Sequence, residues 1–190
     1  MAVNVDTVYQ KVLALSSKEQ RGYVTPQEFN LLADKAQLEI FDSYFHDIKT
    51  AYHKPKNQMG VAFDEIEILQ EKLHPFKAVT TSTIDQALIA GPAALYKINT
   101  ISTDDQEITE LTQKEILYTE NNPLTQATTN RMVYVREQNA FRLYPTPTEE
   151  ISVTFDYWRT PTTPRWGYVV VNKRALYNNS TTYSTNFELH

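Results

Sequence analysis

The segment Ile151–Trp166, ISVTFDYWRTPTTPRW, carries two different patterns in succession. Over residues 151–158, apolar and polar residues alternate, which is typical of an antiparallel strand with one buried face. The rest of the segment contains a proline-broken stretch with the chain's two tryptophans at its ends. Because Pro161 and Pro164 fix φ and lack a backbone N–H, this part cannot continue a sheet. The segment therefore predicts a strand followed by a stiff, extended crossing.

Other segments on both sides of this one also read as strands. They are rich in β-branched and aromatic residues and are bounded by turn residues. The expected strands are residues 76–84, 94–102, 133–136, 141–144 and 168–172. Between the third and fourth of these, residues 137–140 (EQNA) predict a four-residue hairpin loop in which Asn139 takes a left-handed conformation.

The N-terminal third predicts helices. Asp6 is the expected cap of a first helix, and Gly22 is its expected C-cap or turn residue. Thr25, Pro26 and Glu28 form a capping box with proline at the first helical position, which predicts a helix running to about residue 52. We expect this second helix to be buried on more than one side. Its apolar residues at helical spacing are Phe29, Leu32, Ala33, Ala36, Ile40, Tyr44 and Ile48.

Two shorter helices follow. One is expected near Asp64–Leu73 and is closed by Pro75. The other begins at a second capping box, formed by Thr112 and Glu115, and stops at Asn121–Pro123. The inner face of the first of these helices consists of Phe63, Ile66, Leu69 and Leu73.

Helices followed by strands define an α+β fold class. We expect an N-terminal helical bundle with a few strands over residues 1–130, an antiparallel β region over 131–171, and an extended polar arm over 172–190. The arm has Tyr183 and Phe187 as its main apolar residues. Its composition is typical of a mobile tail, so its ordering requires docking, either on its own fold or, preferably, on a neighbouring chain.

Composition excludes several classes of protein. The 190 residues include no cysteine, so disulfides and thiolate metal sites are excluded. No apolar run approaches the roughly 20 residues of a membrane helix, and the N-terminus does not resemble a secretory signal. The net charge of −5 argues against non-specific DNA binding.

The charge is unevenly distributed along the chain. Residues 1–130 hold 11 Lys/Arg and 18 Asp/Glu, a balance of −7, and residues 131–190 hold 7 and 5, a balance of +2. One interpretation is chance together with a solvated helical surface. The other is that surfaces of opposite sign meet between subunits.

No residue set predicts an enzyme or a cofactor site. The four glycines do not cluster into a phosphate-binding loop. His46 and His53 share a helix face but lie about 10 Å apart along it, which does not suit a zinc site. Glu67 and Glu71 offer an acid–base pair in principle, but acidic residues in the early turns of a helix are expected from its dipole. We therefore expect no catalytic residues, metal or cofactor.

The aromatic residues of the C-terminal half allow two interpretations. They could form a stacking face for a carbohydrate, or they could pack in the core or at a protein interface, where Tyr, Trp and Arg are enriched. Packing is the more common explanation. The residues concerned are Tyr144, Tyr157, Trp158, Trp166 and Tyr168.

Two segments resemble structural proteins of tailed bacteriophages. Residues 8–45, from VYQKV to FDSYF, resemble the N-terminal helices of such proteins, and residues 132–167, from MVYVRE to TPRWG, resemble the β region of neck proteins. Together these segments cover about 40% of the chain. The most similar group is the head-to-tail adaptor, or neck-ring, proteins of short-tailed (podovirus-type, crAss-like) phages.

The resemblance implies a virion protein of the neck or tail region, assembled in the host cytoplasm. It implies a homo-oligomeric ring of about twelve copies that connects the portal protein to tail or further ring proteins, lets DNA pass without specific binding, and has no membrane association. Such chains are expected to continue past NFELH into another helical segment. The candidate contact residues are Tyr157, Trp158, Arg159, Pro161, Pro164, Arg165, Trp166, Tyr183 and Phe187, with the arm.

Three alternatives remain open from the sequence. The first is another phage structural role, as a minor capsid, tail or decoration protein. The second is a carbohydrate-binding module that uses the aromatic face. The third is an enzyme that acts through Glu67 or His46.

Overall fold

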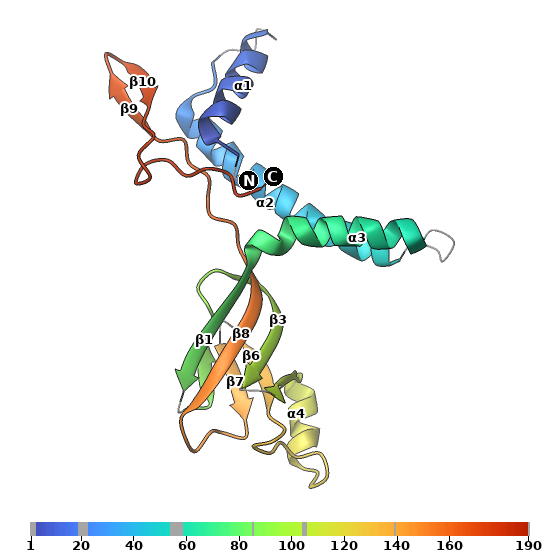
Figure 1. The fold of residues 1–190 in the computed structure, drawn as a ribbon. Coiled ribbons are helices and arrows are strands. Elements are labelled where there is room, and N and C mark those ends of the chain that lie inside the picture. The colour runs from blue at the N-terminus through green and yellow to red at the C-terminus, as the bar shows by residue number, and fades with distance from the viewer. Residues whose placement is uncertain are drawn as a thin grey trace. The chain divides into compact units, whose positions relative to one another are not determined.

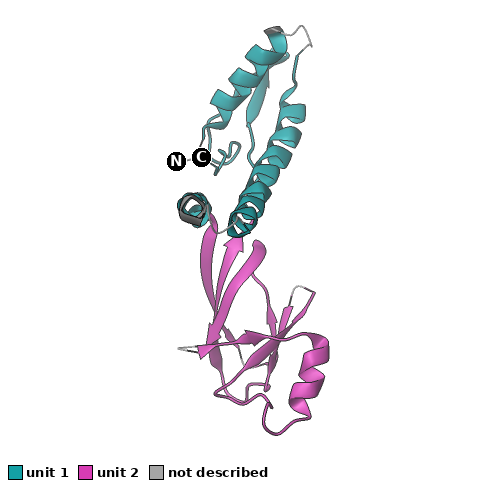
Figure 2. Ribbon diagram, turned by 90° about the vertical axis from the view of Figure 1, so that its right-hand side faces the viewer, with its two compact units in different colours: residues 1–75, 161–190 teal, residues 76–160 magenta. Residues whose placement is uncertain are grey.

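Two compact units make up the computed structural model (Figures 1 and 2). The structure describes residues 3–18, 23–53, 59–84, 86–103, 106–138 and 140–189. Unit 1 comprises Met1–Pro75 and Pro161–His190, and unit 2 comprises Phe76–Thr160, so unit 2 interrupts unit 1 in the sequence. The division into 1–130, 131–171 and 172–190 follows composition rather than contacts and stays a prediction.

Three helices form the first part of unit 1, as expected: α1 (Val5–Lys18), α2 (Pro26–Tyr52) and α3 (Met59–Leu73). The capping box that predicts α2 is confirmed. The Thr25 hydroxyl accepts from the Glu28 N–H at 3.3 Å, and a Glu28 carboxylate oxygen accepts from the Thr25 N–H at 2.9 Å. These bonds satisfy two of the donors that every helix N-terminus leaves open.

The predicted cap of α1 is wrong. Asn4, not Asp6, caps the helix, because the Asn4 side-chain oxygen accepts from the backbone N–H groups of Asp6 at 2.8 Å and Thr7 at 3.2 Å. Asp6 lies in the first turn instead, with its carboxylate available for another partner. The expected C-cap, Gly22, lies outside the described residues.

The buried face of α2 is narrower than predicted. Its buried stripe includes Phe29, Ala33, Gln37 and Phe41, at intervals of four residues. Several residues assigned to the apolar stripe are exposed, with Leu32 at 61% and Ile40 at 45%. The C-terminal part of the chain is hydrogen-bonded to Gln37 and covers the stripe that contains this residue. The neighbouring apolar side chains of α2 therefore stay exposed.

The third helix begins earlier than expected, at Met59 rather than Asp64. On its inner face Ile66 and Leu73 are buried and Leu69 is half-buried, as predicted, while the Phe63 side chain lies outside what the structure describes. A short 3₁₀ turn, η2 (His74–Phe76), contains Pro75 and ends the helical run.

The C-terminal part of unit 1 contains a small hairpin, β9 (Tyr168–Val171) and β10 (Arg174–Tyr177). Asn172 and Lys173 connect the strands with φ of 50° and 64°, the left-handed conformation of a tight hairpin turn. The sequence predicted β9 but not β10. The core of unit 1 brings α1, α2 and this hairpin together around Val5, Tyr9, Phe29, Ala33 and Trp166.

Unit 2 contains two four-stranded sheets. The first has the order β1-β8-β3-β4, and the second has the order β2-β7-β6-β5, with β5 parallel to β6. The strands of the first sheet are β1 (Lys77–Ile84), β8 (Ile151–Arg159), β3 (Leu95–Thr103) and β4 (Gln106–Glu107). Those of the second are β2 (Leu88–Ala90), β7 (Ala140–Tyr144), β6 (Val133–Glu137) and β5 (Thr109–Glu110).

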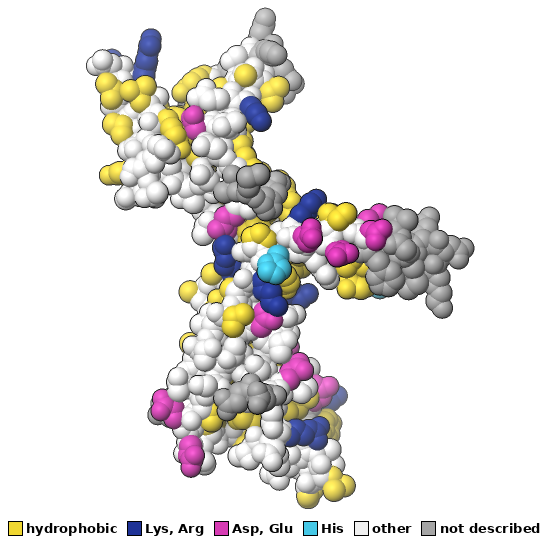
Figure 3. Space-filling view, viewed as in Figure 1, with side chains coloured by type: hydrophobic (Ala, Val, Ile, Leu, Met, Phe, Trp, Pro, Cys, Tyr) yellow, Lys and Arg dark blue, Asp and Glu magenta, His cyan; other side chains and the backbone are white. Residues whose placement is uncertain are grey.

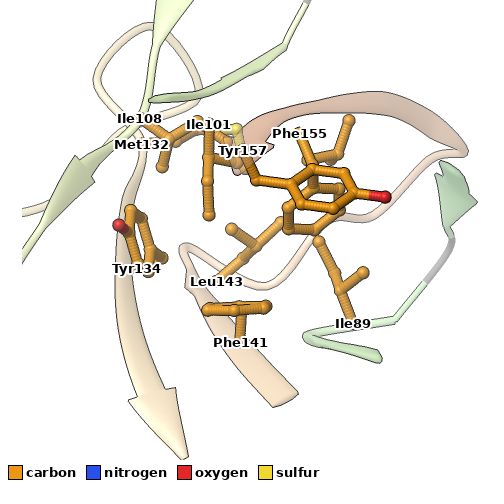
Figure 4. Close-up of a cluster of buried hydrophobic side chains, with 10 residues drawn as sticks. Ile89, Ile101, Ile108, Met132, Tyr134, Phe141, Leu143, Phe155 and Tyr157 are labelled. Carbon is orange, nitrogen blue, oxygen red and sulfur yellow. The ribbon is translucent and has the colours of Figure 1, made fainter. Parts of the chain in front are cut away.

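The core of unit 2 draws on both sheets (Figure 4). Val153, Phe155 and Tyr157 of β8 are buried, while Ser152 of the same strand is exposed, so the predicted alternation is confirmed. The opposing side chains come mainly from β6 and β7, and Phe141 lies 5.5 Å from Phe155 between ring centroids. As the central strand between β1 and β3, β8 organises the first sheet.

Helix α4 (Gln113–Glu120) follows its predicted capping box, with Thr112 as N-cap and Asn121 as C-cap. Its Ile116 packs with Val133 and Val135 of β6, while Tyr134, between them, belongs to the core shown in Figure 4. Strand β6 is therefore buried on both faces, which accounts for its continuous apolar run.

The hairpin loop predicted at residues 137–140 is shorter than expected. Glu137 and Ala140 are register partners, so the strands continue to those residues and the turn has two residues. Gln138 has φ of 49°, and the expected left-handed Asn139 lies outside the described residues. With these changes of detail, the α+β fold class is confirmed.

Candidate assembly surface

The segment from Tyr157 to Trp166 contributes to both units. Tyr157, Trp158 and Arg159 end β8 in unit 2, and the residues from Pro161 onward belong to unit 1. In unit 2 the Tyr157 ring is buried, and its hydroxyl lies 3.3 Å from that of Thr80. The Arg159 guanidinium lies 5.6 Å from the centroid of the Phe76 ring, a cation–π distance.

Trp166 is the central residue of unit 1, with 3% of its surface exposed. Its indole N–H donates to the Asp6 carboxylate at 2.9 Å. Its backbone N–H donates to the Asn30 side-chain oxygen at 2.8 Å, and its carbonyl accepts from the Asn30 amide at 3.2 Å. Every polar group of the residue therefore has a partner on α1 or α2.

Aromatic rings surround the Trp166 indole. The ring of Tyr9 on α1 lies 4.4 Å away between centroids, in a tilted arrangement. The rings of Tyr168 and Tyr177, register partners in the hairpin, stack on it at 5.8 and 5.6 Å. Trp166 therefore joins α1, α2 and the hairpin into one core, and its indole is not available to a ligand.

A buried glutamine holds the proline-stiffened crossing. Gln37 is 1% exposed, and its amide donates to the Thr162 carbonyl at 2.7 Å. Its side-chain oxygen accepts from the Glu188 N–H at 3.2 Å, and the Glu188 carboxylate accepts from the Thr162 N–H at 3.0 Å. Pro161 and Pro164 are buried beside these bonds. One side chain of α2 thus fixes both the crossing and the arm.

The C-terminal arm docks on its own unit. Phe187 and Val3 form an antiparallel bridge with both N···O distances at 3.1 Å. Asn186 accepts from the Val5 N–H at 3.1 Å, and Leu189 is buried. Of the two docking modes expected from the sequence, the structure displays docking on the same chain, and docking on a neighbour stays a prediction.

A close approach fixes the arm next to Trp166. A Cβ placed on Gly167 would lie 2.5 Å from the Tyr183 carbonyl oxygen, so only glycine fits there without displacing the arm. The Gly167 N–H donates to the Ser184 hydroxyl at 3.0 Å. A second bridge, between Arg165 and Thr185, has N···O distances of 2.9 and 2.8 Å.

The nine candidate contact residues divide into a buried and an accessible group. Tyr157, Pro161, Pro164 and Trp166 are buried, so they anchor the segment in the interior and cannot contact a neighbour directly. Trp158, Arg159 and Phe187 are half-buried, and Arg165 and Tyr183 are exposed. A neighbouring molecule can reach the second group directly.

Most residues of the expected aromatic face pack inside the units. Tyr157 and Trp166 are buried, and Tyr144 packs against the cluster of α4 and β6. Tyr168 is stacked on Trp166. Four of the five residues are therefore used in packing, while Trp158 is half-buried at the end of β8. The five residues are divided between the two units.

The other residues considered for chemistry lie on the surface. His46, His53, Glu67 and Glu71 are all exposed. Within the described ranges, no three His, Asp or Glu residues come together in a way that could hold a metal ion. None of the described helices is long and apolar enough to cross a bilayer.

Sequence reasoning missed two residues that build this surface, Asn30 and Gln37. They lie seven positions apart on α2, and both use their amide side chains on the crossing. Their spacing of two helical turns, within an otherwise apolar stripe, could have indicated them. A buried amide side chain needs hydrogen-bond partners, so such residues point to a segment that packs on the helix.

Apolar side chains remain uncovered on unit 1. The hairpin exposes Val169 at 49%, Val170 at 63%, Val171 at 46% and Leu176 at 52%. A groove of about 430 Å³ is lined by residues of α1, α2 and the arm, among them Val12, Leu32, Ile40 and Phe187. Contiguous exposed apolar surface on a protein usually marks an interaction site.

These features define a two-unit α+β structural protein whose uncovered surfaces suit assembly. The model of the SU10 adaptor protein family matches residues 61–168, which is more than half of the chain, and the protein belongs to that family. It is a phage head-to-tail adaptor of the podovirus-like type, a virion structural protein that associates with portal and tail proteins. No curated protein matches the chain.

The family decides the first of the alternatives that the sequence left open, the choice among phage structural roles. Among phage structural roles it assigns the adaptor rather than a minor capsid, tail or decoration protein. It is a family of adaptor structural proteins.

Proposed function

We propose that the adaptor acts as a homo-oligomeric ring, of about twelve copies, in the neck of the virion. The ring would lie between the portal and the tail or further ring proteins, and it would form in the host cytoplasm. The observation that supports this proposal best is the apolar surface of unit 1, which a single copy leaves in water. Burial of such surface is the main driving force for protein association.

The net charge agrees with a passage for DNA. Each copy carries −5, so a closed ring accumulates negative charge and repels the phosphate backbone. DNA would therefore pass through the opening without specific binding.

The neighbour contacts are proposed to include the accessible part of the Tyr157–Trp166 segment and the arm. Arg165 and Tyr183 reach the surface, whereas Pro161, Pro164 and Trp166 hold them in place from the interior. Arginine and tyrosine are enriched among residues that dominate binding energy.

Imaging of assembled particles tests the proposal. A ring of density for this chain between portal and tail is expected, with a copy number from native mass spectrometry of the isolated neck. The variant Arg165→Ala/Tyr183→Ala should reduce its incorporation, and Thr181→Ala, an exposed change in the same arm, should not. Particles that carry the chain in another location, or as separate copies, would contradict the proposal.

A further inference from the structure

The two surfaces that carry this inference are the outer face of the β9–β10 hairpin and a pocket between α2 and α3. Both belong to unit 1, and they share no residue. The inference rests on the proposed ring and names the surfaces through which its copies meet.

One face of the hairpin rests on Trp166 through two tyrosines, although Val170 on that same face is 63% exposed. In a β-ladder, directly opposed residues and those two positions along share a face. Tyr168 and Tyr177 are partners, and their rings stack on Trp166. The opposite face therefore contains the partners Val169 and Leu176 and the partners Val171 and Arg174. We call this face the outer face. It presents three exposed apolar side chains, Val169, Val171 and Leu176, and the cation Arg174 next to the turn.

A two-stranded hairpin is only marginally stable in water. Here a single packed face, resting on Trp166, supports it, and the second face leaves Val169, Val171 and Leu176 about half exposed. A cover for this face would bury apolar area and order the hairpin at the same time.

The pocket has the complementary chemistry. It measures about 350 Å³, on the order of ten water molecules, and its lining consists of Asp47, Thr50, Ala51, Glu65, Ile68 and Leu69. Apolar side chains of α3 form part of it, with Ile68 at 54% exposure. Asp47 from α2 and Glu65 from α3 add two carboxylates.

The charges around the two surfaces are of opposite sign. Helix α3 contains four acidic residues and one cation, Lys72, whose ammonium lies 5.6 Å from the centroid of the Tyr44 ring. Residues 161–187 contain Arg165, Lys173 and Arg174 and no acidic residue. Figure 3 shows acidic side chains along α3 and basic side chains at the end of the hairpin.

We propose that the outer face of the hairpin of one copy, Val169, Val171, Arg174 and Leu176, binds the α2–α3 pocket of the next copy. Leu176 and the valines contact Ile68 and Leu69, and Arg174, with Lys173 beside it, pairs with Asp47 and Glu65. Because each copy offers the hairpin on one surface and the pocket on another, the contact is head-to-tail, which is the type that closes into rings.

Charge reversal and rescue test the pairing. In full-length protein assembled into particles, Arg174→Glu and Asp47→Lys should each lower the number of rings at least tenfold. The double variant Arg174→Glu/Asp47→Lys should recover most of them, because the pair is restored with reversed sign. Arg131→Glu, at an exposed position of unit 2, should leave rings unchanged. Thermal unfolding of each isolated variant verifies that it is folded.

Mixing of two variants tests the head-to-tail geometry. Leu176→Asp breaks the hairpin face and Ile68→Asp breaks the pocket, and neither variant alone should form dimers or rings. A mixture should form heterodimers and stop there, since one intact hairpin meets one intact pocket. Native mass spectrometry with isotope-labelled copies identifies them.

The outcomes separate this inference from the proposed ring. Rings in the wild type that persist in folded Arg174→Glu, Asp47→Lys and Leu176→Asp variants would overturn the inference and leave the ring. Loss in the single variants without recovery in the double variant would also overturn the pairing. If rings are lost only in the Leu32→Asp variant, the contact lies at the apolar groove that Leu32 lines, and the hairpin–pocket contact is overturned. A wild type that never forms rings would overturn the proposed function instead.

Discussion

The indole N–H of Trp166 donates to Oδ1 of Asp6 at 2.9 Å, although 160 residues separate them in the chain. This bond links the first turn of α1 to the crossing that follows unit 2. It shows that unit 1 is closed by contacts between its two sequence segments.

We predict that Trp166→Phe lowers the free energy of unfolding of unit 1 by about 2 kcal/mol, because it removes a hydrogen bond to a charged acceptor in a buried setting. Urea unfolding followed by circular dichroism measures the change. Tyr52→Phe removes a polar group from an exposed side chain and should stay within about 0.5 kcal/mol of the wild type. Equal stability of the Trp166 variant and this control would show that the bond is not important.

The role of Gln37 predicts a second effect. Gln37→Leu keeps a similar volume but leaves the Thr162 carbonyl and the Glu188 N–H without their partner, so we expect a loss of about 2 kcal/mol. Hydrogen exchange at the Glu188 amide should accelerate with it. Gln70→Leu, on the exposed surface of α3, is the matched control. Unchanged protection at Glu188 would mean that Gln37 does not hold the arm.

The capping boxes predict a dependence on acid. Backbone and side-chain hydrogen bonds from Thr25 and Thr112 lower the pKa of Glu28 and Glu115 below their ordinary value of 4.5. A group whose pKa is lower in the folded state contributes stability above its unfolded pKa and loses it as the pH falls through the folded pKa. The N-termini of α2 and α4 should therefore weaken below about pH 4.5.

Thermal unfolding between pH 7 and pH 3 measures this effect. Glutamine also completes a capping box, so Glu28→Gln and Glu115→Gln should be folded and should show a smaller decline with acid. An identical decline in the wild type and the double glutamine variant would assign the acid sensitivity to other groups.

Unit 2 should fold by itself. The buried residues of the cluster in Figure 4 all lie within Phe76–Thr160, and the first and last strands of the unit are paired, with Lys77 opposite Trp158. We expect residues 76–160 to unfold cooperatively in a single transition. Heteronuclear NMR of that segment tests this expectation, and a collapsed spectrum without dispersion would contradict it.

The sequence was sufficient where one local rule governs the structure. Capping boxes placed the starts of α2 and α4, and strict alternation placed β8, because a few neighbouring residues determine each of these features. The predicted cap of α1 was wrong because both Asn4 and Asp6 are residue types that cap helices well. In the structure the Asp6 carboxylate accepts a hydrogen bond from the distant Trp166 indole, and Asn4 caps the helix.

Long-range contacts explain the other differences. The stripe of α2 was read from hydrophobicity, but the crossing and the arm cover Gln37 and leave Leu32 exposed. No local pattern shows which side of a helix a segment more than one hundred residues away will cover. The position of Trp166 as the centre of a core, rather than at the surface, depends on the same kind of contact.

The interruption of unit 1 by unit 2 has a consequence for synthesis on the ribosome. The chain emerges from the N-terminus, so α1 and α2 leave the exit tunnel long before Trp166 and the arm that complete their core. Unit 2 is contiguous and can fold as soon as Thr160 has emerged. The apolar side of α1 and α2 therefore stays uncovered while unit 2 is translated, and it is covered only when the segment Pro161–His190 has been made.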